Sequence, residues 1–304
     1  MHPAAPVSAP PLDLSVVIAC DGEGWRLDQP VAALVSALRG LRAEILVVHA
    51  AGQPAGEVPE GAGQPHISVL TAAPGSVVPH LWGLGVRSAR GSVVALTTTQ
   101  IRVRPPWARA VLEALSGPRA AAGGPIDQPR KVSMLARAAY LLRYFAYLPG
   151  GRRGPAPELP GENVAYRRDV LQRHSALFAQ GFWEVEVHRQ LRAEGHELAW
   201  TDAAVVDFVP SVTLLGMVRN RLVHGAHFGQ YRVRELRWPW WRALMVTPLV
   251  PAVLLGRIAR HAVAARPGRL GTFAAALPAL LVLLVAWATG EAAGAWRGRR
   301  ALAG

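Results

Sequence analysis

Short apolar runs rich in β-branched residues recur through the first hundred residues, and stretches with apolar positions at helical spacing lie between them. The runs predict buried strands at residues 14–19, 44–49, 66–70 and 92–96. The stretches predict helices at residues 29–40 and 78–90. Strands and helices that alternate in this way favour an α/β fold with a doubly wound, mainly parallel sheet.

The last third of the chain carries two apolar runs of different length. Residues 270–290 are 21 residues without a charge, which matches the ~20 that a membrane-spanning helix needs; a buried core helix is the alternative. Residues 243–256 are charge-free for only 14 residues and contain two prolines, which predicts a short span or a re-entrant segment. The Trp- and Arg-rich residues 237–242 are typical of a membrane–water interface.

The formal net charge of +13 is concentrated beside these runs. Residues 1–207 carry 20 basic and 18 acidic side chains, whereas residues 208–304 carry 13 arginines and two glutamates. Basic residues beside apolar segments are attracted by anionic membrane lipids at roughly 1 kcal/mol each, so such lipids are an expected partner. A nucleic-acid-binding protein, the alternative, more often spreads its basic residues over a soluble face, so nucleic acid is not expected as a partner.

These patterns predict the domain organisation. The chain divides into a flexible tail (1–12), an α/β domain (13–210), a basic juxtamembrane segment (211–237), a membrane-associated region (238–292) and a basic tail (293–304). Residues 1–11 lack the apolar core of a secretory signal, so the α/β domain is expected to face the cytoplasm at the inner cell membrane. The single cysteine, Cys20, excludes an internal disulfide framework and a Cys-rich zinc module.

Five short segments of the first 207 residues follow one another in a recognisable order. They are Ser15-Val-Val-Ile-Ala with Glu44-Ile-Leu-Val-Val, Ala89-Arg-Gly-Ser-Val-Val-Ala-Leu, Arg104-Pro-Pro-Trp, Pro160-Gly-Glu-Asn-Val-Ala-Tyr-Arg-Arg, and Gly181-Phe-Trp-Glu with Leu191 and Gly195. In this order and spacing they resemble the family 2 glycosyltransferases, which have a GT-A fold. The resemblance implies transfer of a sugar from a nucleotide-sugar donor.

On the donor side, the resemblance implies a site at the ends of the first two strands. Parallel sheets bind ligands beyond the carboxyl ends of their strands, so Ala19 and Asp21 are expected to contact the donor. The family places an aspartate for the nucleotide base after the second strand, and His49 stands in this region instead. The expected base contact therefore lacks its carboxylate.

The resemblance also implies a position for a divalent metal, which the family holds with an Asp-x-Asp motif. Thr98 and Gln100 stand at the matching positions. Their oxygens are neutral, whereas Mg²⁺ and Mn²⁺ prefer anionic oxygen ligands, so neither a metal nor another cofactor is expected. Arg102, or Arg104, is expected to neutralise the donor phosphates in its place; two solvated arginines on a loop are the alternative.

On the acceptor side, Glu184 stands where the resemblance places the family's catalytic aspartate. If a helix begins near residue 182, Glu184, His188 and Leu191 share one of its faces and Glu186 points away. A carboxylate suits the general base that sugar transfer to a hydroxyl needs, and His188 is expected to orient it or titrate with it. A surface helix with an ordinary Glu–His pair is the alternative.

Five further residues are predicted to bind the acceptor or a phosphate. Asn163, Tyr166 and Arg167 lie in a segment that opens into a helix, and an ordinary helix start with exposed arginine is the alternative. Arg221 and His224 lie in the basic juxtamembrane segment, where headgroup anchoring is the alternative.

The sequence thus predicts a membrane-anchored, inverting glycosyltransferase with a lipid-linked or membrane-proximal acceptor. The alternative is a GT-A domain that has lost its activity and serves as a membrane-bound binding or scaffolding subunit. The loss of both donor-side acidic positions is the feature that favours this alternative.

Overall fold

The computed structural model describes residues 12–20, 25–52, 65–150, 155–179, 181–234, 236–265 and 269–300. The chain forms two compact units, which are described separately below. The α/β unit comprises Met1–Asp127 and Arg152–Phe208, and the helical unit comprises Gln128–Gly151 and Val209–Gly304. The boundary at Phe208 lies close to the predicted one, but the sequence did not indicate that Gln128–Gly151 joins the C-terminal helices.

The described part of the α/β unit contains a main sheet of seven strands in the order β3-β2-β1-β4-β8-β6-β9. The strands are β1 (Leu14–Cys20), β2 (Ala43–Ala50), β3 (His66–Ala72), β4 (Val93–Thr98), β6 (Ala121–Gly123), β8 (Val164–Arg167) and β9 (Leu198–Trp200). Strands β3, β2, β1 and β4 are parallel, and β8 runs antiparallel to both of its neighbours. The predicted α/β fold with a mainly parallel sheet is therefore confirmed.

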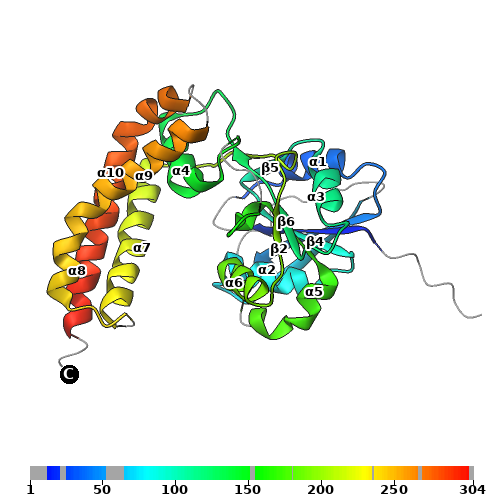
Figure 1. Ribbon diagram of the computed structural model, residues 1–304, viewed down its shortest axis with the longest axis horizontal. Helices are drawn as coiled ribbons and strands as arrows, with labels where there is room; N and C mark the ends of the chain where they lie inside the picture. The colour runs from blue at the N-terminus through cyan, green and yellow to red at the C-terminus, as the bar shows by residue number, and fades with distance from the viewer. Residues whose placement is uncertain are drawn as a thin grey trace, which may run out of the picture. The chain divides into compact units, whose positions relative to one another are not determined.

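Helices cover both faces of this sheet (Figure 1). They are α1 (Asp28–Ala37), α2 (Val78–Ser88), α3 (Trp107–Ala114), α5 (Arg168–Arg173) and α6 (Glu184–Ala193). Helices α2, α5 and α6 share one core with the sheet, in which Val17, Leu81 and Phe182 are fully buried. Strands β1, β2 and β4 are buried along their whole length, which explains why their sequences are continuous apolar runs.

A smaller sheet of three short strands lies beside the main one, in the order β5-β10-β7. The strands are β5 (Ile101–Val103), β7 (Ile126–Asp127) and β10 (Val206–Phe208). Arg104 follows β5, and its guanidinium donates to both oxygens of Asp207 at 2.6 and 3.1 Å and to Asp127 at 3.0 Å. These bonds tie the three strands together and raise the pKa of Arg104.

The helical unit is built around its last helix, α10 (Arg269–Arg300). The other helices are α4 (Met134–Tyr144), α7 (Leu214–Arg234), α8 (Trp240–Val246) and α9 (Val250–Ala265). Within the described residues, two helical stretches are long and apolar enough to cross a membrane: Trp240–Ala264 and Leu270–Arg299. In their most apolar windows, 17% and 33% of the residues are buried inside the structure.

Glycines bring α7 and α10 into backbone contact. A Cβ added at Gly229 would lie 2.1 Å from the carbonyl oxygen of Glu291, and one at Gly294 would lie 2.0 Å from that of Ala226. The spacing of these glycines, Gly225-xxx-Gly229 on α7 and Gly290-xxx-Gly294-xxx-Gly298 on α10, is the small-residue pattern of close helix pairs in membranes. Beside this contact, the fully buried Glu291 pairs with Arg232.

Candidate functional site

Several carboxylate side chains lie close together near the carboxyl end of β4 in the α/β unit. The short 3-10 helix η2 (Gly161–Asn163) carries Glu162, which is 8% exposed. The hydroxyl of Thr98, the last residue of β4, donates to the Glu162 carboxylate at 3.5 Å. The strand itself ends in the neutral side chain of Thr98, with Gln100 close behind, whereas the fold brings the carboxylate of Glu162 here from a distant segment.

Glu184 begins α6 and faces the same group of carboxylates. Burial raises the pKa of Glu184 from its ordinary value of 4.5, and the negative charges of Glu162 and Glu158 raise it further. A Cβ at Gly161 would lie 2.9 Å from the carboxyl carbon of Glu184, so a larger residue at this position would displace the Glu184 carboxylate. We refer to Glu158, Glu162 and Glu184 as the acidic cluster.

His188 lies one turn after Glu184 and is fully buried. Its Nε2 is 2.7 Å from the hydroxyl of Tyr166, and its Nδ1 is 3.2 Å from the carboxylate of Glu158. An ionised carboxylate only accepts hydrogen bonds, so Nδ1 donates to Glu158 and Nε2 of the neutral ring accepts from Tyr166. Burial lowers the pKa of His188, which favours this neutral ring. The sequence predicts that His188 orients Glu184 or titrates with it. In the structure both ring nitrogens of His188 instead contact other partners, Tyr166 and Glu158.

The face that the sequence predicted for α6 agrees with the structure. Val187, His188 and Leu191 are buried and Glu184 is largely covered, while Glu186 forms an ion pair with Arg189 on the outside of the helix. Glu184 and Glu186 therefore differ in environment as the helical spacing predicted.

The donor-side residues lie at the carboxyl ends of neighbouring strands. Ala19 is fully buried near the end of β1 and pairs with Thr98 of β4. His49 is 8% exposed near the end of β2, and its Nε2 lies 3.2 Å from the hydroxyl of Thr71. Asp21 lies outside the described residues. Ala19, His49 and Thr98 therefore line one edge of the sheet, and their donor contacts stay predictions.

The two arginines that follow β4 differ in their surroundings. Arg104 is held by Asp207 and Asp127, as described above, so its charge is already neutralised within the fold. Arg102, in β5, is half-buried. Of the two arginines, Arg102 is therefore the candidate for binding a phosphate of the donor, and this role stays a prediction.

The described residues at this edge do not fit a tight divalent-metal site. Thr98 and Gln100 offer neutral oxygens, and the acidic cluster does not bring three ligand atoms within 4.8 Å of one another. The one group of His, Cys, Asp and Glu in the described chain that meets this criterion is His174, Glu194 and His196, on another part of the unit. That donor binding needs no metal stays a prediction.

Two of the residues predicted to bind the acceptor or a phosphate, Asn163 and Tyr166, lie in the interior of the α/β unit. Asn163 is fully buried, accepts from Trp107 at 2.8 Å and donates to the carbonyls of Pro125 and Ala204. Tyr166 is buried as well, against His188. Both residues hold the interior together, and their contact with an acceptor stays a prediction.

Arg167 lies at the opposite end of the sheet from the acidic cluster. It pairs with Val93, the first residue of β4, whereas Thr98 is the last. Five residues of extended chain span roughly 16 Å, so Arg167 and Thr98 cannot contact one small ligand. The guanidinium of Arg167 is bound by Asp169 at 2.9 Å. Its contact with an acceptor or a phosphate stays a prediction.

Arg221 and His224 belong to α7 of the helical unit. The guanidinium carbon of Arg221 lies 5.6 Å from the centre of the Trp287 ring, and burial, together with the charge of Arg143, lowers the pKa of Arg221. His224 is exposed. The predicted contact of these two residues with a phosphate is not tested by the structure.

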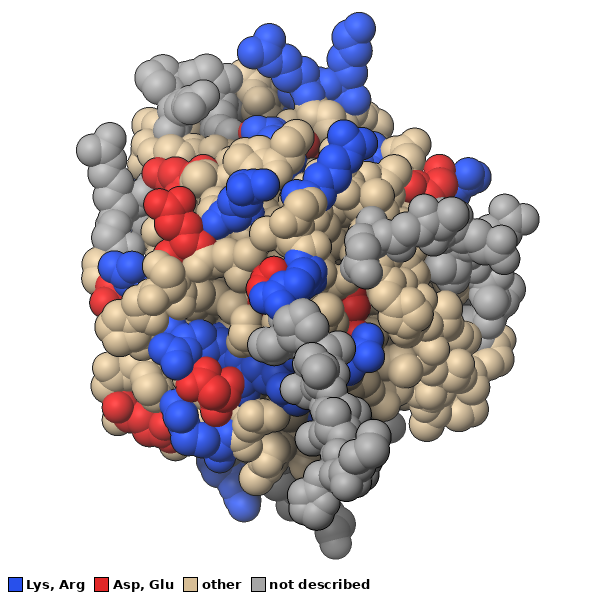
Figure 2. Space-filling view, turned by 90° about the vertical axis from the view of Figure 1, so that its right-hand side faces the viewer, with Lys and Arg blue, Asp and Glu red and all other residues tan. Residues whose placement is uncertain are grey.

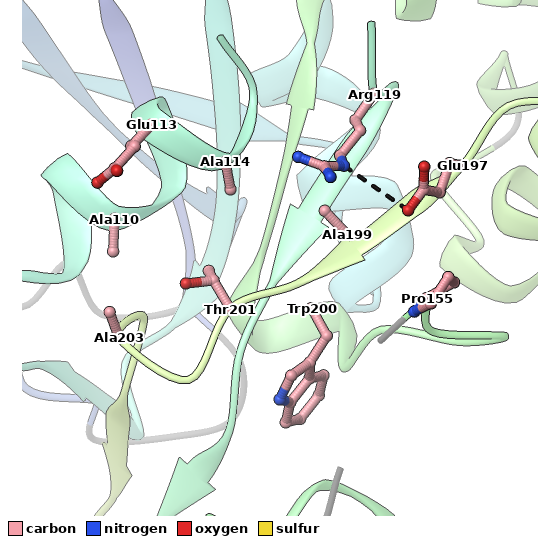
Figure 3. A pocket seen from close by; sticks show the side chains of 10 residues that line it. All are labelled: Ala110, Glu113, Ala114, Arg119, Pro155, Glu197, Ala199, Trp200, Thr201 and Ala203. Atoms are coloured by element: carbon pink, nitrogen blue, oxygen red, sulfur yellow. Dashed lines mark ion pairs between the residues drawn. The ribbon is translucent and has the colours of Figure 1, made fainter. Parts of the chain in front are cut away.

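Two surface pockets of the α/β unit lie away from the acidic cluster. One, of about 610 Å³, is lined by α3 and the loop after β9, and Figure 3 shows the ion pair of Arg119 with Glu197 at its rim. The other, of about 630 Å³, lies beyond the carboxyl end of β3 and includes Thr71, the partner of His49. The second pocket is the one that borders the predicted donor edge.

The charged side chains on the face shown in Figure 2 are mixed in sign. Acidic groups lie among the basic ones there, in keeping with the near balance of charge before residue 208. This face does not have the continuous basic surface that is typical of a nucleic-acid-binding protein.

The seven-stranded, mainly parallel sheet with helices on both faces defines an α/β protein, and the structural comparison shows a GT-A-like fold. Among solved structures, the chain is similar to the mannosyltransferase PcManGT from Pyrobaculum calidifontis in complex with GDP-Man and Mn²⁺. The TM-score is 0.53 at 15% identity, over 97% of this chain and 91% of that one. GalNAc-T7 with UDP, GalNAc and Mn²⁺ matches at a TM-score of 0.46 and 14% identity, over 66% of this chain and 44% of that one.

The likeness to the mannosyltransferase shows the fold, and it extends over both units of the chain. No family model matches the sequence, and no curated protein matches it.

Proposed function

We propose that the protein is a membrane-anchored glycosyltransferase that moves a sugar from a nucleotide-sugar donor to a lipid-linked or membrane-proximal acceptor, with inversion. The observation that carries this proposal is the acidic cluster at the carboxyl end of β4, with Glu184 at its centre. Sugar transfer to a hydroxyl needs a base close to that hydroxyl, and a partly buried carboxylate with a raised pKa is such a base.

In this mechanism Glu184 takes the proton from the acceptor hydroxyl as its oxygen attacks the anomeric carbon of the donor sugar. The nucleoside diphosphate leaves from the other side of the sugar ring, so one displacement inverts the anomeric configuration. Arg102 is the proposed cation for the leaving phosphates. The ribose and base would lie over the ends of β1 and β2, beside Ala19, Asp21 and His49.

The fold supports this proposal, because a solved structure with a similar fold is a mannosyltransferase in complex with GDP-Man. The two apolar stretches, Trp240–Ala264 and Leu270–Arg299, support the membrane anchor through their length and composition. The arginines beside them favour contact with anionic lipids on the cytoplasmic side of an inner membrane.

The test is a transfer assay on the full chain in detergent, with a panel of nucleotide sugars and membrane lipids from the source cell. Release of the nucleoside diphosphate together with a sugar-modified lipid would support the proposal, and the anomeric configuration of the product would report inversion. Donor binding, measured by calorimetry with and without EDTA, tests independence from metal. The absence of both transfer and donor binding over the whole panel would contradict an enzymatic role.

The second candidate is a membrane-bound binding or scaffolding subunit. It is favoured by His49, whose two ring nitrogens lie within hydrogen-bond distance of Thr71 and the carbonyl of Ala50, so the ring is occupied where a base-binding carboxylate is expected. This candidate predicts that the nucleotide sugar is neither bound nor cleaved.

A further inference from the structure

We propose that His174, Glu194 and His196 bind one divalent transition-metal ion of the zinc type. One ligand atom from each of these residues lies within 4.8 Å of the other two. They come from three different places in the fold: the end of α5, the end of α6 and the loop that leads into β9. This inference is independent of the proposed function.

The geometry of the ligand atoms is the first support. Nε2 of His174 lies 2.9 Å from Oε2 of Glu194, and Nε2 of His196 lies 4.0 Å from the same oxygen. A tetrahedral zinc ion with bonds of about 2.0–2.1 Å holds its ligand atoms roughly 3.3 Å apart. The observed separations bracket this value, so small side-chain rotations would complete the site.

The second support is an unsatisfied nitrogen. Nε2 of His174 is buried and has no hydrogen-bond partner among the described residues, even though a Glu194 oxygen is only 2.9 Å away. The pair is close enough for a hydrogen bond but does not have the required angle. Two electron-pair donors at this distance repel each other unless a cation lies between them, and a metal ion accepts both lone pairs.

The third support is the rigidity of the ligands. Gly195 has a positive φ of 83°, which turns the chain after α6 and directs His196 back toward Glu194. The backbone N–H of His196 donates to Leu191 at 2.9 Å and fixes this turn. The other carboxylate oxygen of Glu194 accepts from Gln190 at 2.7 Å, which leaves Oε2 for the metal.

Two imidazoles and one carboxylate form the ligand set of zinc and of neighbouring transition metals. His196 and Glu194 are about one-third exposed, so water is available for the fourth position. Glu184 and Glu194 stand ten residues apart on and just after α6, which is about 15 Å of helix. The ion would therefore tie the turns at the ends of α5 and α6 together, away from the acidic cluster.

The test uses the full chain without a histidine tag, stripped with EDTA and then titrated with Zn²⁺ against a chromophoric chelator. One Zn²⁺ per chain is expected, with affinity at least tenfold weaker in Glu194→Gln and in His196→Ala. The matched control is Glu197→Gln, which removes the same charge three residues further on from an ion pair with Arg119. Co²⁺ in place of Zn²⁺ should give a visible absorption band that the two ligand variants lose.

Less than one equivalent of bound zinc in the unsubstituted chain would overturn the inference, as would equal zinc affinity in all the variants. Circular dichroism of the stripped proteins separates loss of a ligand from loss of the fold. Glu194→Gln also separates this site from the donor site. EDTA sensitivity that disappears in this variant belongs to the zinc site, whereas sensitivity that persists belongs to donor binding.

Discussion

Replacing Glu184 by glutamine tests the proposed chemistry most directly. The substitution keeps the shape of the side chain and its place beside Gly161 but removes its basicity. General-base assistance contributes about 10²–10⁴ in rate, or about 3–5 kcal/mol of transition-state stabilisation. Turnover of the nucleotide sugar should fall by this factor in Glu184→Gln, while donor affinity stays unchanged.

The pKa of Glu184 also fixes the direction of two pH effects. A base must be ionised, so activity should fall on the acidic side as the pH drops through the raised pKa of Glu184, above 4.5. A carboxyl whose pKa is higher in the folded than in the unfolded state stabilises the fold at low pH, and this contribution is lost as the pH rises. At neutral pH, Glu184→Gln should therefore melt at the same temperature as the unsubstituted protein or higher.

The control is Glu186→Gln, two residues further along the helix. Glu186 faces outward in an ion pair with Arg189, so its replacement should leave turnover within about twofold, as is usual for an exposed pair. Initial rates of nucleotide release by both variants, with their melting curves, decide the matter. Equal rates in both variants, or a large loss in Glu186→Gln alone, would refute the assignment of the base.

Three further substitutions and one matched control have definite expected outcomes. Gly161→Ala should lower turnover with little change in melting temperature, because the added methyl group displaces the Glu184 carboxylate rather than backbone; normal rates would show that this close contact is not needed. Tyr166→Phe leaves Nε2 of His188 without its donor and should lower the free energy of unfolding by about 1–3 kcal/mol, measured by denaturant titration. Gly294→Ala should destabilise the helical unit by about 1–3 kcal/mol, because its Cβ would lie 2.0 Å from a carbonyl oxygen of α7. Gly271→Ala in the same helix meets open space and should be neutral or stabilising; equal melting of the two variants in detergent would contradict the tight α7–α10 contact.

The parts of the fold that the sequence predicted well are those with strong local signals. Strands β1, β2 and β4 are buried on both faces, and their apolar runs could be identified without knowledge of their neighbours. The strands β5, β7 and β10 contain only two or three residues each, too few for any periodicity. Gln128–Gly151 contacts helices that lie far away in the sequence. The local pattern of apolar and polar residues does not indicate such a long-range contact.

The acidic cluster could not be predicted from the sequence, because its members come from segments that only the fold brings together. In the segment from Pro160 to Arg168, the sequence favours Asn163, Tyr166 and Arg167 as ligand-binding residues, because amide and basic groups suit sugars and phosphates. In the structure the same segment delivers Glu162 to the end of β4 and carries Arg167 to the other end of that strand. Only the antiparallel pairing of β8 with β4 decides which residue reaches which edge, and pairing partners are not visible in one sequence.

Charge balance at the edge of the sheet bears on how the proposed donor could bind there. Glu162 and Glu184 are carboxylates, and a nucleoside diphosphate brings further negative charge, so a cation is needed for the two to share one site. Arg104 cannot supply it, because Asp207 and Asp127 already neutralise its guanidinium. Arg102 is the arginine of this segment that remains, and a divalent ion carried in with the donor is the other source. If Arg102 is the cation, Arg102→Gln weakens donor binding, and an excess of Mg²⁺ leaves the donor affinity of the unsubstituted protein unchanged. If a divalent ion is the cation, Arg102→Gln leaves donor affinity unchanged, and an excess of Mg²⁺ strengthens donor binding by the unsubstituted protein.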